Sequence, residues 1–312
     1  MEIFDFSIIV LCYNPDYQSL MNTISSIFNQ KEVTFELVIC DDGSSFDYEQ
    51  KLKDDIQHIW GDAPVKYVFN KQNGGTIRNY LSGIRMSKGE YIKPISPGDY
   101  LFNEFSLKRY KDIFSEHNSN IVFSDAIYYS NDKVLNKRQY PANTLVFDKR
   151  NMKEMYCVYG YFFLGATLCS KRETVKSYLS KVENSVLYLE DYSMMMMALL
   201  DNEKITGINE PLIWYEFGEG ISTNSSGNTR IAVDSERVHQ YLIENYKDNN
   251  ILKDALQVRS IKMRPFAEKV ILMLIKYPKF YIYKIGEHIG HKQKQFKYSI
   301  GMRDLIVAKK GV

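Results

Sequence analysis

The chain of 312 residues is 45% hydrophobic and 25% charged, which is typical of a globular protein with room for one large α/β domain and a smaller appendage. Its four cysteines form no CxxC or Cys/His cluster, and no apolar stretch approaches the roughly 20 residues of a membrane-spanning helix. These features argue against a disulfide frame, a zinc site and a membrane span. The N-terminus lacks the pattern of a signal peptide, so we expect a cytoplasmic protein. The net charge of +2 conceals a contrast, because residues 251–312 carry +10 and residues 1–250 carry −8.

The first ninety residues alternate strand and helix patterns. Near-continuous apolar runs, typical of strands covered on both faces, are separated by segments with apolar residues at helical spacing. In chain order we expect strands at Phe6–Cys12, Phe35–Cys40, Val65–Phe69 and Tyr91–Lys93, with helices at about 16–29 and through 77–84. Strands separated by helices in this way form βαβ crossovers, so we predict a mostly parallel sheet.

Polar and glycine-rich clusters follow these strands. They are Tyr13-Asn14, Asp41-Asp42, Asn73-Gly74-Gly75 and Ser96-Pro97-Gly98-Asp99. In a doubly wound sheet the ligand binds at the carboxyl ends of the strands, so these clusters would lie at the binding edge. Turn formation and helix capping explain any single cluster of this kind equally well. Four clusters in succession favour a ligand site.

The second half of the chain has a more mixed pattern. We expect a helix at 103–117, a strand at 120–123, irregular sequence at about 130–155, a helix from about 190, a short strand at 212–215 and helices from 229 onward. The run Met194–Met197 is interpreted as core packing, because methionine fills irregular gaps in apolar cores. We expect a domain of residues 1–225 followed by a basic, mostly helical region of residues 226–312.

The ordered set of clusters resembles family 2 glycosyltransferases of the GT-A fold. The resemblance covers about residues 6–225 and is carried by Ile8 to Asn14, Ser25 to Gln30, Val38 to Ser44, Asn73 to Asn79, Gly89 to Ile92, Ser96 to Asp99 and Glu190-Asp191. It implies an α/β fold, with a Rossmann-like, mostly parallel sheet flanked by helices and a C-terminal helical extension. It also implies an inverting enzyme that moves a hexose or N-acetylhexosamine from a nucleotide sugar, by family frequency a UDP-sugar, to a lipid-linked or protein-linked saccharide in cell-surface glycan synthesis.

The resemblance assigns the nucleotide-sugar donor to the clusters at the strand ends. Asp42 would accept the imide N–H of a uracil or thymine ring, since an ionised carboxylate only accepts hydrogen bonds. Asn14 would line the base and ribose, and Arg78 would approach the pyrophosphate. The complete set of implied donor-binding residues is Tyr13, Asn14, Asp42, Asn73, Gly74, Arg78, Ser96 and Asp99.

The implied metal site departs from the family's pattern. Relatives usually end the fourth strand in an Asp-x-Asp-Asp run, whereas the run Ser96 to Asp99 keeps only the last carboxylate. One carboxylate with phosphate oxygens and water can still hold Mn²⁺ or Mg²⁺, so we expect a divalent metal bound by Asp99, more weakly than at a two-carboxylate site. A second departure is Glu216, where relatives often have a basic residue. Phosphate neutralisation would then fall to Arg78 or a neighbouring lysine.

The resemblance places the catalytic carboxylates in the pair Glu190-Asp191. Asp191 would be the general base that deprotonates the acceptor hydroxyl, at a helix start where the dipole favours an ionised carboxylate. Acidic residues are also common in first helical turns for that reason alone. One displacement with one base predicts inversion at the anomeric carbon. The segment Tyr159–Gly165 would form part of the acceptor wall, with Tyr161 and Phe162 as stacking faces.

The basic C-terminal region suggests a membrane partner. Within 258–285, apolar residues recur at three- and four-residue steps and are flanked by lysine and arginine. Such a helix can lie in the headgroup plane, so the pattern favours peripheral association with the inner leaflet over a helix packed on the catalytic domain with a solvated basic face. No nucleic-acid module is recognisable, so nucleic acid is not expected as a partner. The oligomeric state stays open.

Other protein classes use similar sheets. A dinucleotide-dependent oxidoreductase needs G-x-G-x-x-G after the first strand, and a nucleotidyltransferase needs a basic glycine-rich loop there, but this chain has neither. A non-catalytic GT-A-like subunit that binds nucleotide sugars or acts as a scaffold would explain the depleted Ser96–Asp99 run. Joint retention of Asp42, Asp99 and Asp191 favours the enzyme. The sequence does not specify the sugar, the acceptor or the linkage.

Overall fold

A single sheet runs through the molecule. The computed structural model describes residues 4–131, 133–135, 152–160, 163–218 and 225–285, with the side chains of 225–228 excepted. Within these residues the sheet has nine strands in the order β3-β2-β1-β4-β8-β6-β9-β5, and β7 pairs with β6. The strands are β1 (Phe6–Cys12), β2 (Phe35–Asp41), β3 (Val65–Phe69), β4 (Tyr91–Ile95), β5 (Tyr100–Leu101), β6 (Ile121–Ser130), β7 (Lys133–Val134), β8 (Cys169–Lys171) and β9 (Ile205–Glu216).

The N-terminal half of the sheet is parallel, as predicted. β1 pairs in parallel with β2 and β4, and β2 pairs in parallel with β3. Cys12 lies opposite Asp41, and Asp41 lies opposite Phe69, so three strands end level with one another. The other half is mixed: β8 runs antiparallel to β4 and β6, β5 runs antiparallel to β9, and β6 and β9 are parallel.

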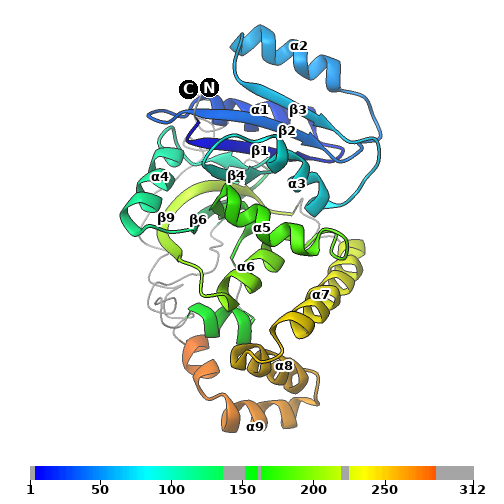
Figure 1. The fold of residues 1–312 in the computed structure, drawn as a ribbon, viewed down its shortest axis with the longest axis vertical. Coiled ribbons are helices and arrows are strands. Elements are labelled where there is room, and N and C mark those ends of the chain that lie inside the picture. The colour runs from blue at the N-terminus through cyan, green and yellow to red at the C-terminus, as the bar shows by residue number, and fades with distance from the viewer. Residues whose placement is uncertain (1–3, 132, 136–151, 161–162, 219–224, 286–312) are drawn as a thin grey trace.

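Helices cover both faces of the sheet (Figure 1). They are α1 (Tyr17–Phe28), α2 (Glu49–Trp60), α3 (Thr76–Met86), α4 (Ser106–His117), α5 (Arg172–Val182), α6 (Glu190–Leu200), α7 (Ser225–Tyr246), α8 (Asn250–Lys262) and α9 (Phe266–Lys276), with a π-helical turn, η1 (Glu154–Val158), and a 3₁₀ turn, η2 (Gly165–Thr167). Successive residues of a strand point to opposite faces. Ile8 of β1 accordingly packs in the cluster that contains α1, whereas Ile9 packs in the cluster that contains α3. Both faces of the sheet are therefore apolar and covered.

The predicted elements of the first half match the structure closely, and the second half differs. The helix α2 was not predicted, because only Leu52 and Ile56 along it are buried and its apolar stripe is narrow. The strands β6 and β9 extend well beyond the predicted 120–123 and 212–215. β9 contains Pro211 and its pairing with β6 shifts register near Asp125, so its pattern does not read as one strand. The Met194–Met197 run is buried, as predicted.

The C-terminal region is divided where the sequence predicted one helix across 258–285. The helix α8 ends at Lys262 and α9 begins at Phe266, because Pro265 cannot continue a helix and disfavours helical geometry in the residue before it. Both helices pack on η1 through a small apolar core that includes Tyr159, Ile261 and Met273. Among the described residues, no helix has the length and apolar character needed to cross a membrane. The division at residue 225 stays a proposal.

Candidate active site

The loop after β1 is tied to the loop after β2. Asn14 has a left-handed backbone (φ 46°), which a short polar residue tolerates. Its side-chain oxygen accepts hydrogen bonds from Ser45 N at 2.8 Å and Ser45 Oγ at 2.9 Å. Its own N–H donates to Ser44 Oγ at 2.7 Å. The neighbouring Tyr13 is 55% exposed, so its ring stands at the surface beside a fixed loop.

Asp42 joins the loop after β2 to the loop after β3. Its two carboxylate oxygens accept hydrogen bonds from Gly74 N at 2.8 Å and Gly75 N at 2.9 Å. Burial raises the pKa of Asp42, while these two backbone bonds act in the opposite direction. Each carboxylate oxygen has room for a second hydrogen bond. Asp42 is therefore a clamp between two loops that keeps the capacity to accept an N–H from a ligand.

Asp41, the other half of the acidic pair, has a local structural role. Its carboxylate accepts hydrogen bonds from Ser44 N at 2.8 Å and from the Tyr48 hydroxyl at 2.8 Å. These bonds hold the turn that leads from β2 to α2. The structure thus separates two adjacent carboxylates by role: Asp41 faces its own turn, and Asp42 faces the next loop.

Arg78 and Asn73 lie beside this clamp. A Cβ added at Gly74 would lie 3.4 Å from Arg78 Cδ and 3.8 Å from Asp42 Oδ1, so the three residues are neighbours. Arg78 is exposed, and its Nε donates to the Glu183 backbone oxygen at 3.3 Å. Asn73 is also exposed, and its side-chain oxygen accepts from Gly75 N at 3.2 Å. The predicted pyrophosphate-binding cation is therefore next to the predicted base-binding carboxylate.

Asp99 is the buried acid at the end of the loop between β4 and β5. It is 5% exposed, whereas Ser96 of the same loop is exposed. Asp99 Oδ1 accepts from Glu216 N at 3.0 Å, and the Asp99 backbone oxygen accepts from Thr23 Oγ1 at 2.9 Å. Burial raises the pKa of Asp99 to about 7, against the lowering effects of the Glu216 N–H and the Lys93 charge.

Lys93 is a fully buried cation that acts on Asp99. It lies on β4, and its ammonium group donates to Pro94 O at 2.8 Å and Ala166 O at 2.5 Å. Burial lowers its pKa to about 8. A charged lysine here favours the ionised form of Asp99 without being exposed to a ligand itself. It is not the neutralising lysine that the sequence suggested for the diphosphate.

Glu216 supplies a second carboxylate next to Asp99. Gly98 has φ 96°, and any side chain at that position would run into Glu216 Oε2. The Glu216 carboxylate therefore lies against the Gly98 backbone, one residue from Asp99. The sequence marked Glu216 only as a departure from a basic position. Its place follows from the pairing of β9 with β5 and β6.

Asp191 and Glu190 begin α6, as predicted. Asp191 Oδ1 accepts from Tyr192 N at 2.6 Å, and a Cβ added at Gly165 would lie 2.8 Å from Asp191 Oδ2. Burial raises the pKa of both carboxyls, and the charge of Asp191 raises that of Glu190 further. The two carboxyls therefore hold protons more readily than exposed carboxyls do.

Tyr215 connects the two groups of carboxylates. It precedes Glu216 on β9, and after burial the charges of Asp99 and Asp191 are the causes that raise its pKa to about 12. Both carboxylates are thus close enough to act on one phenol. Gly165, which lies against Asp191, belongs to η2, and η2 packs on β9, whose Glu216 N–H donates to Asp99. The predicted metal ligand and the predicted base therefore both lie near β9.

Asp234, which the sequence did not single out, holds the segment before α6. It lies on α7, is 1% exposed, and accepts from Leu187 N at 2.9 Å and Tyr188 N at 2.6 Å. Leu187 O in turn accepts from Ile77 N at 3.0 Å at the start of α3. Asp234 therefore positions Glu190 and Asp191 from a helix outside the proposed N-terminal domain. No local pattern marks it, because the contact is made by tertiary folding.

The predicted acceptor wall is only partly described. Tyr161 and Phe162, its proposed stacking faces, lie outside the described residues. Phe163 is buried and stacks on Phe123 with ring centroids 3.9 Å apart. Tyr159 is buried as well, so neither of these two rings faces a ligand.

The described residues contain no group of three or more His, Cys, Asp or Glu placed to hold a metal ion. Asp99 and Glu216 are two carboxylates, one fewer than such a group requires. Two carboxylates offer the hard oxygen ligands that Mg²⁺ and Mn²⁺ prefer, and Mg²⁺ sites commonly use one or two carboxylates with substrate phosphates and water. The residues present therefore fit a divalent ion that a diphosphate helps to bind.

Comparisons with known proteins find similar sequences and similar folds. The model of glycosyl transferase family 2 matches residues 7–172. An uncharacterized glycosyltransferase of Rickettsia bellii is 31% identical over 130 residues, covering 41% of this chain and 17% of that protein. Chondroitin synthase of Pasteurella multocida is 29% identical over 96 residues, covering 30% of this chain and 10% of that protein. The matches therefore span less than a fifth of these curated relatives.

Solved structures share the fold along nearly the whole chain. TarS residues 1–349 of S. aureus superpose with a TM-score of 0.58 at 18% identity, covering 92% of this chain and 80% of that one. The same protein in complex with UDP-GlcNAc gives 0.53 at 16% identity, covering 95% and 93%. The mannosyltransferase PcManGT of Pyrobaculum calidifontis, in complex with GDP-Man and Mn²⁺, gives 0.54 at 12% identity, covering 96% and 89%. At these identities the likeness shows a common fold, that of the GT-A proteins.

Proposed function

The chain belongs to glycosyl transferase family 2, and from that premise we propose that it transfers a hexose or N-acetylhexosamine from a UDP-sugar to a saccharide acceptor, with inversion. One observation carries the proposal: β9 holds Asp99 through the Glu216 N–H and packs against η2, whose Gly165 lies against Asp191. At the carboxyl ends of the same sheet, Asp42 clamps the loops after β2 and β3. The arrangement provides a place for the nucleotide, a place for the diphosphate and a base in one continuous region.

We assign the nucleotide to the loops after β1, β2 and β3. Asp42 has acceptor capacity left for the imide N–H of uracil, and the exposed Tyr13 ring can pack on the base or ribose. Arg78 lies next to Asp42 with its guanidinium exposed, where it can pair with the diphosphate. TarS has been crystallised with UDP and with UDP-GlcNAc, which favours UDP as the carrier here too.

We assign the divalent ion, Mn²⁺ or Mg²⁺, to Asp99 together with Glu216. Such an ion neutralises charge on the departing diphosphate when it is bound. The protein's own part is to fix Asp99, through the Glu216 N–H and the buried Lys93 charge, so that its second oxygen is held in one orientation. A fold neighbour bound to Mn²⁺ supports this choice of ion.

Asp191 is the proposed general base. It takes the proton from the acceptor hydroxyl as that oxygen attacks the anomeric carbon from the face opposite the diphosphate, so a donor with an α-linkage gives a β-linked product. The start of α6 favours the ionised carboxylate, whereas burial favours the neutral form, and the balance gives a base with a raised pKa. Glu190 is the neighbouring carboxyl at the start of the same helix.

The proposed acceptor is a lipid-linked or protein-linked saccharide in cell-surface glycan synthesis, reached from the cytoplasmic face of the membrane. The exposed apolar and basic residues of the C-terminal helices support a lipid-linked acceptor, because they suit a membrane surface. The named relatives that make chondroitin and hyaluronan support a saccharide product.

A thermal-shift titration tests donor binding. We expect UDP and at least one UDP-sugar to raise the Tm of the wild-type chain, with a larger rise when Mn²⁺ is present. GDP-mannose and NADH serve as controls, because the site proposed for the uracil ring should not bind their nucleobases. A chain that no nucleotide sugar or nucleoside diphosphate stabilises would contradict the proposed function. A chain that binds a UDP-sugar and never turns it over would instead be a non-catalytic subunit.

A further inference from the structure

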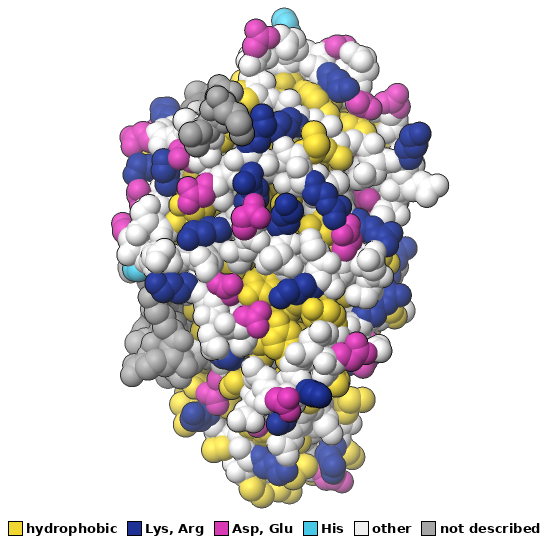
Figure 2. All heavy atoms as spheres, viewed as in Figure 1, with side chains coloured by type: hydrophobic (Ala, Val, Ile, Leu, Met, Phe, Trp, Pro, Cys, Tyr) yellow, Lys and Arg dark blue, Asp and Glu magenta, His cyan; other side chains and the backbone are white. Residues whose placement is uncertain are grey.

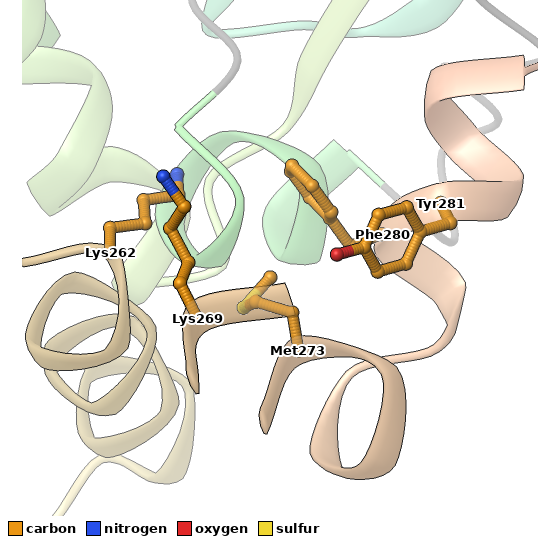
Figure 3. A pocket seen from close by; sticks show the side chains of 5 residues that line it. All are labelled: Lys262, Lys269, Met273, Phe280 and Tyr281. Atoms are coloured by element: carbon orange, nitrogen blue, oxygen red, sulfur yellow. The ribbon is translucent and has the colours of Figure 1, made fainter. Parts of the chain in front are cut away.

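A small cavity lies in the C-terminal helices. Its volume is about 360 Å³, and it is lined by Lys262, Lys269, Met273, Phe280 and Tyr281. Figure 3 shows the ammonium groups of both lysines directed to one side of the cavity, with Phe280 and Tyr281 across from them. We call it the cationic cavity. Among the described residues that line it, none is acidic.

The two lysines lack a carboxylate partner within this lining. Lys262 donates to the Tyr159 backbone oxygen at 2.8 Å and lies 5.7 Å from the centroid of the Phe280 ring. An ammonium group has three hydrogens to donate, so further donor capacity remains for a ligand. Lys269 lies 5.4 Å from the centroid of the Phe266 ring. Burial lowers the pKa of Lys262, and the nearby Lys284 lowers it further. A bound anion would offset both effects, because it stabilises the charged form of Lys262.

Carboxylates near the cavity are engaged elsewhere. Glu154 accepts from the Tyr159 and Tyr283 hydroxyls and pairs with Lys279 at 3.5 Å. Asp254 accepts from the Tyr277 hydroxyl at 3.1 Å. Both carboxylates are bonded to other groups. They therefore do not pair with the two lysines of the cavity.

The helices that line the cavity also expose apolar residues, and on α9 Ile271 and Ile275 lie on the face opposite the cavity residues Lys269 and Met273. The exposed large apolar residues of this end of the chain are Met263 (82% exposed), Phe266 (76%), Ile271 (56%), Leu274 (52%), Ile275 (72%), Ile282 (65%) and Ile285 (62%). Figure 2 shows hydrophobic side chains mixed with Lys and Arg at the end of the molecule formed by α8 and α9. Exposed apolar groups in such number mark an interaction surface, and a cationic cavity on the inner face of the same helix fits a surface with an apolar interior and anionic headgroups.

We propose that the cationic cavity binds the phosphate of an anionic lipid headgroup, while the exposed apolar face of α9 enters the bilayer. The phosphate would take hydrogen bonds from Lys262 and Lys269. This inference deepens the membrane-facing acceptor proposed above, but lipid binding itself needs neither a donor nor turnover.

The cavity is joined to the proposed active site by a short segment. A Cβ added at Gly160 would lie 3.4 Å from Lys262 Nζ, and Gly165 lies against the Asp191 carboxylate. Five residue steps separate these glycines, so their Cα atoms are at most about 18 Å apart. A lipid phosphate held by Lys262 would therefore bring the membrane surface within reach of the base.

Vesicle co-sedimentation tests the proposal with a charge-matched control. The full chain should bind vesicles of phosphatidylcholine with phosphatidylglycerol and not vesicles of phosphatidylcholine alone. The cavity pair Lys262→Gln with Lys269→Gln is compared with Arg264→Gln with Lys276→Gln, which removes two charges from the same end outside the cavity. Charge alone predicts equal losses, about fivefold for each residue. We expect a loss at least about tenfold greater for the cavity pair than for the control. Equal losses would overturn the proposal.

Methyl NMR keeps the test independent of variant stability. In the wild-type chain the Met273 methyl lies in the cavity, so short-chain phosphatidylglycerol below its micellar concentration should shift its resonance. Inorganic phosphate at the same concentration should shift it much less. If inorganic phosphate acts as strongly as the lipid, the cavity is a site for free phosphate and the lipid proposal is wrong. If neither ligand shifts the resonance, the cavity binds no phosphate at all.

Discussion

The loops that follow β1, β2 and β3 differ in their electrostatics from the carboxylates that face them. In the loops, Asn14 accepts hydrogen bonds from Ser45, and Asp42 accepts them from two backbone N–H groups. These bonds hold both side chains in place before a ligand arrives. The second region is an acidic face of Asp99, Glu216, Glu190 and Asp191, and burial raises the carboxyl pKa values of Asp99, Glu190 and Asp191. The loops are held in a fixed shape by their own hydrogen bonds. The acidic face carries the negative charge that a metal ion or a proton transfer needs.

The largest effect should come from the acidic face. We expect Asp191→Asn to lower turnover of a UDP-sugar by about 10²- to 10⁴-fold, because the amide cannot accept the acceptor's proton. The donor dissociation constant should change little, since the loops that bind the nucleotide are untouched. UDP release and a binding titration measure the two quantities. Asp54→Asn, on the exposed surface of α2, is the matched control. Equal turnover in both variants would remove Asp191 as the base.

A smaller effect should show whether Glu216 binds the metal or is only a structural neighbour of Asp99. If its carboxylate helps to hold the metal, Glu216→Gln should weaken Mn²⁺ binding in the presence of UDP by about 10- to 100-fold. The electron paramagnetic resonance signal of free Mn²⁺ measures this directly. Glu210→Gln removes a carboxylate from the exposed part of the same strand and should leave the affinity unchanged. An unchanged affinity in Glu216→Gln would leave Asp99 as the sole proposed ligand.

The pH dependence of metal binding sharpens the same comparison. Asp99 has a pKa of about 7 in the folded chain, so it is protonated below that pH and must release a proton to bind a cation. Apparent Mn²⁺ affinity should therefore rise as pH rises towards 7 and level off above it, with about a tenfold loss for each pH unit below. Mn²⁺ titrations across this range measure it. An affinity that stays flat would show that Asp99 is ionised throughout.

The smallest effect should come from the loops. We expect Tyr13→Ala to weaken UDP binding by about two- to tenfold, because the loss of one ring contact is worth roughly 0.5–1.5 kcal/mol. Turnover at saturating donor should be unaffected. Isothermal titration with UDP tests the first statement, and Phe105→Ala, which removes an exposed ring outside these loops, is the control. A large loss of turnover with unchanged affinity would place Tyr13 in the chemistry instead.

Sequence patterns predicted the loops better than the acidic face. The loops follow strands whose apolar runs and helical spacing are local, so the amino-acid pattern alone assigns Asn14, Asp42 and Asp99 to one sheet edge. Glu216 reaches Asp99 only through the pairing of β9 with β5 and β6, and Asp234 reaches the start of α6 only through the packing of α7. Neither contact has a local signal. The break between α8 and α9 does have a local signal, because Pro265 ends a helix. The regular apolar spacing across 258–285 nevertheless led to the prediction of one helix.

The central claim is that Asp191 acts as the base in a single displacement on a sugar held by these loops. A ¹H NMR time course of slow donor hydrolysis tests it most directly, because water then replaces the unidentified acceptor. From an α-linked UDP-sugar, the wild-type chain should first release the β-anomer, and Asp191→Asn should release almost none. First release of the α-anomer, or equal hydrolysis by the variant, would contradict the account.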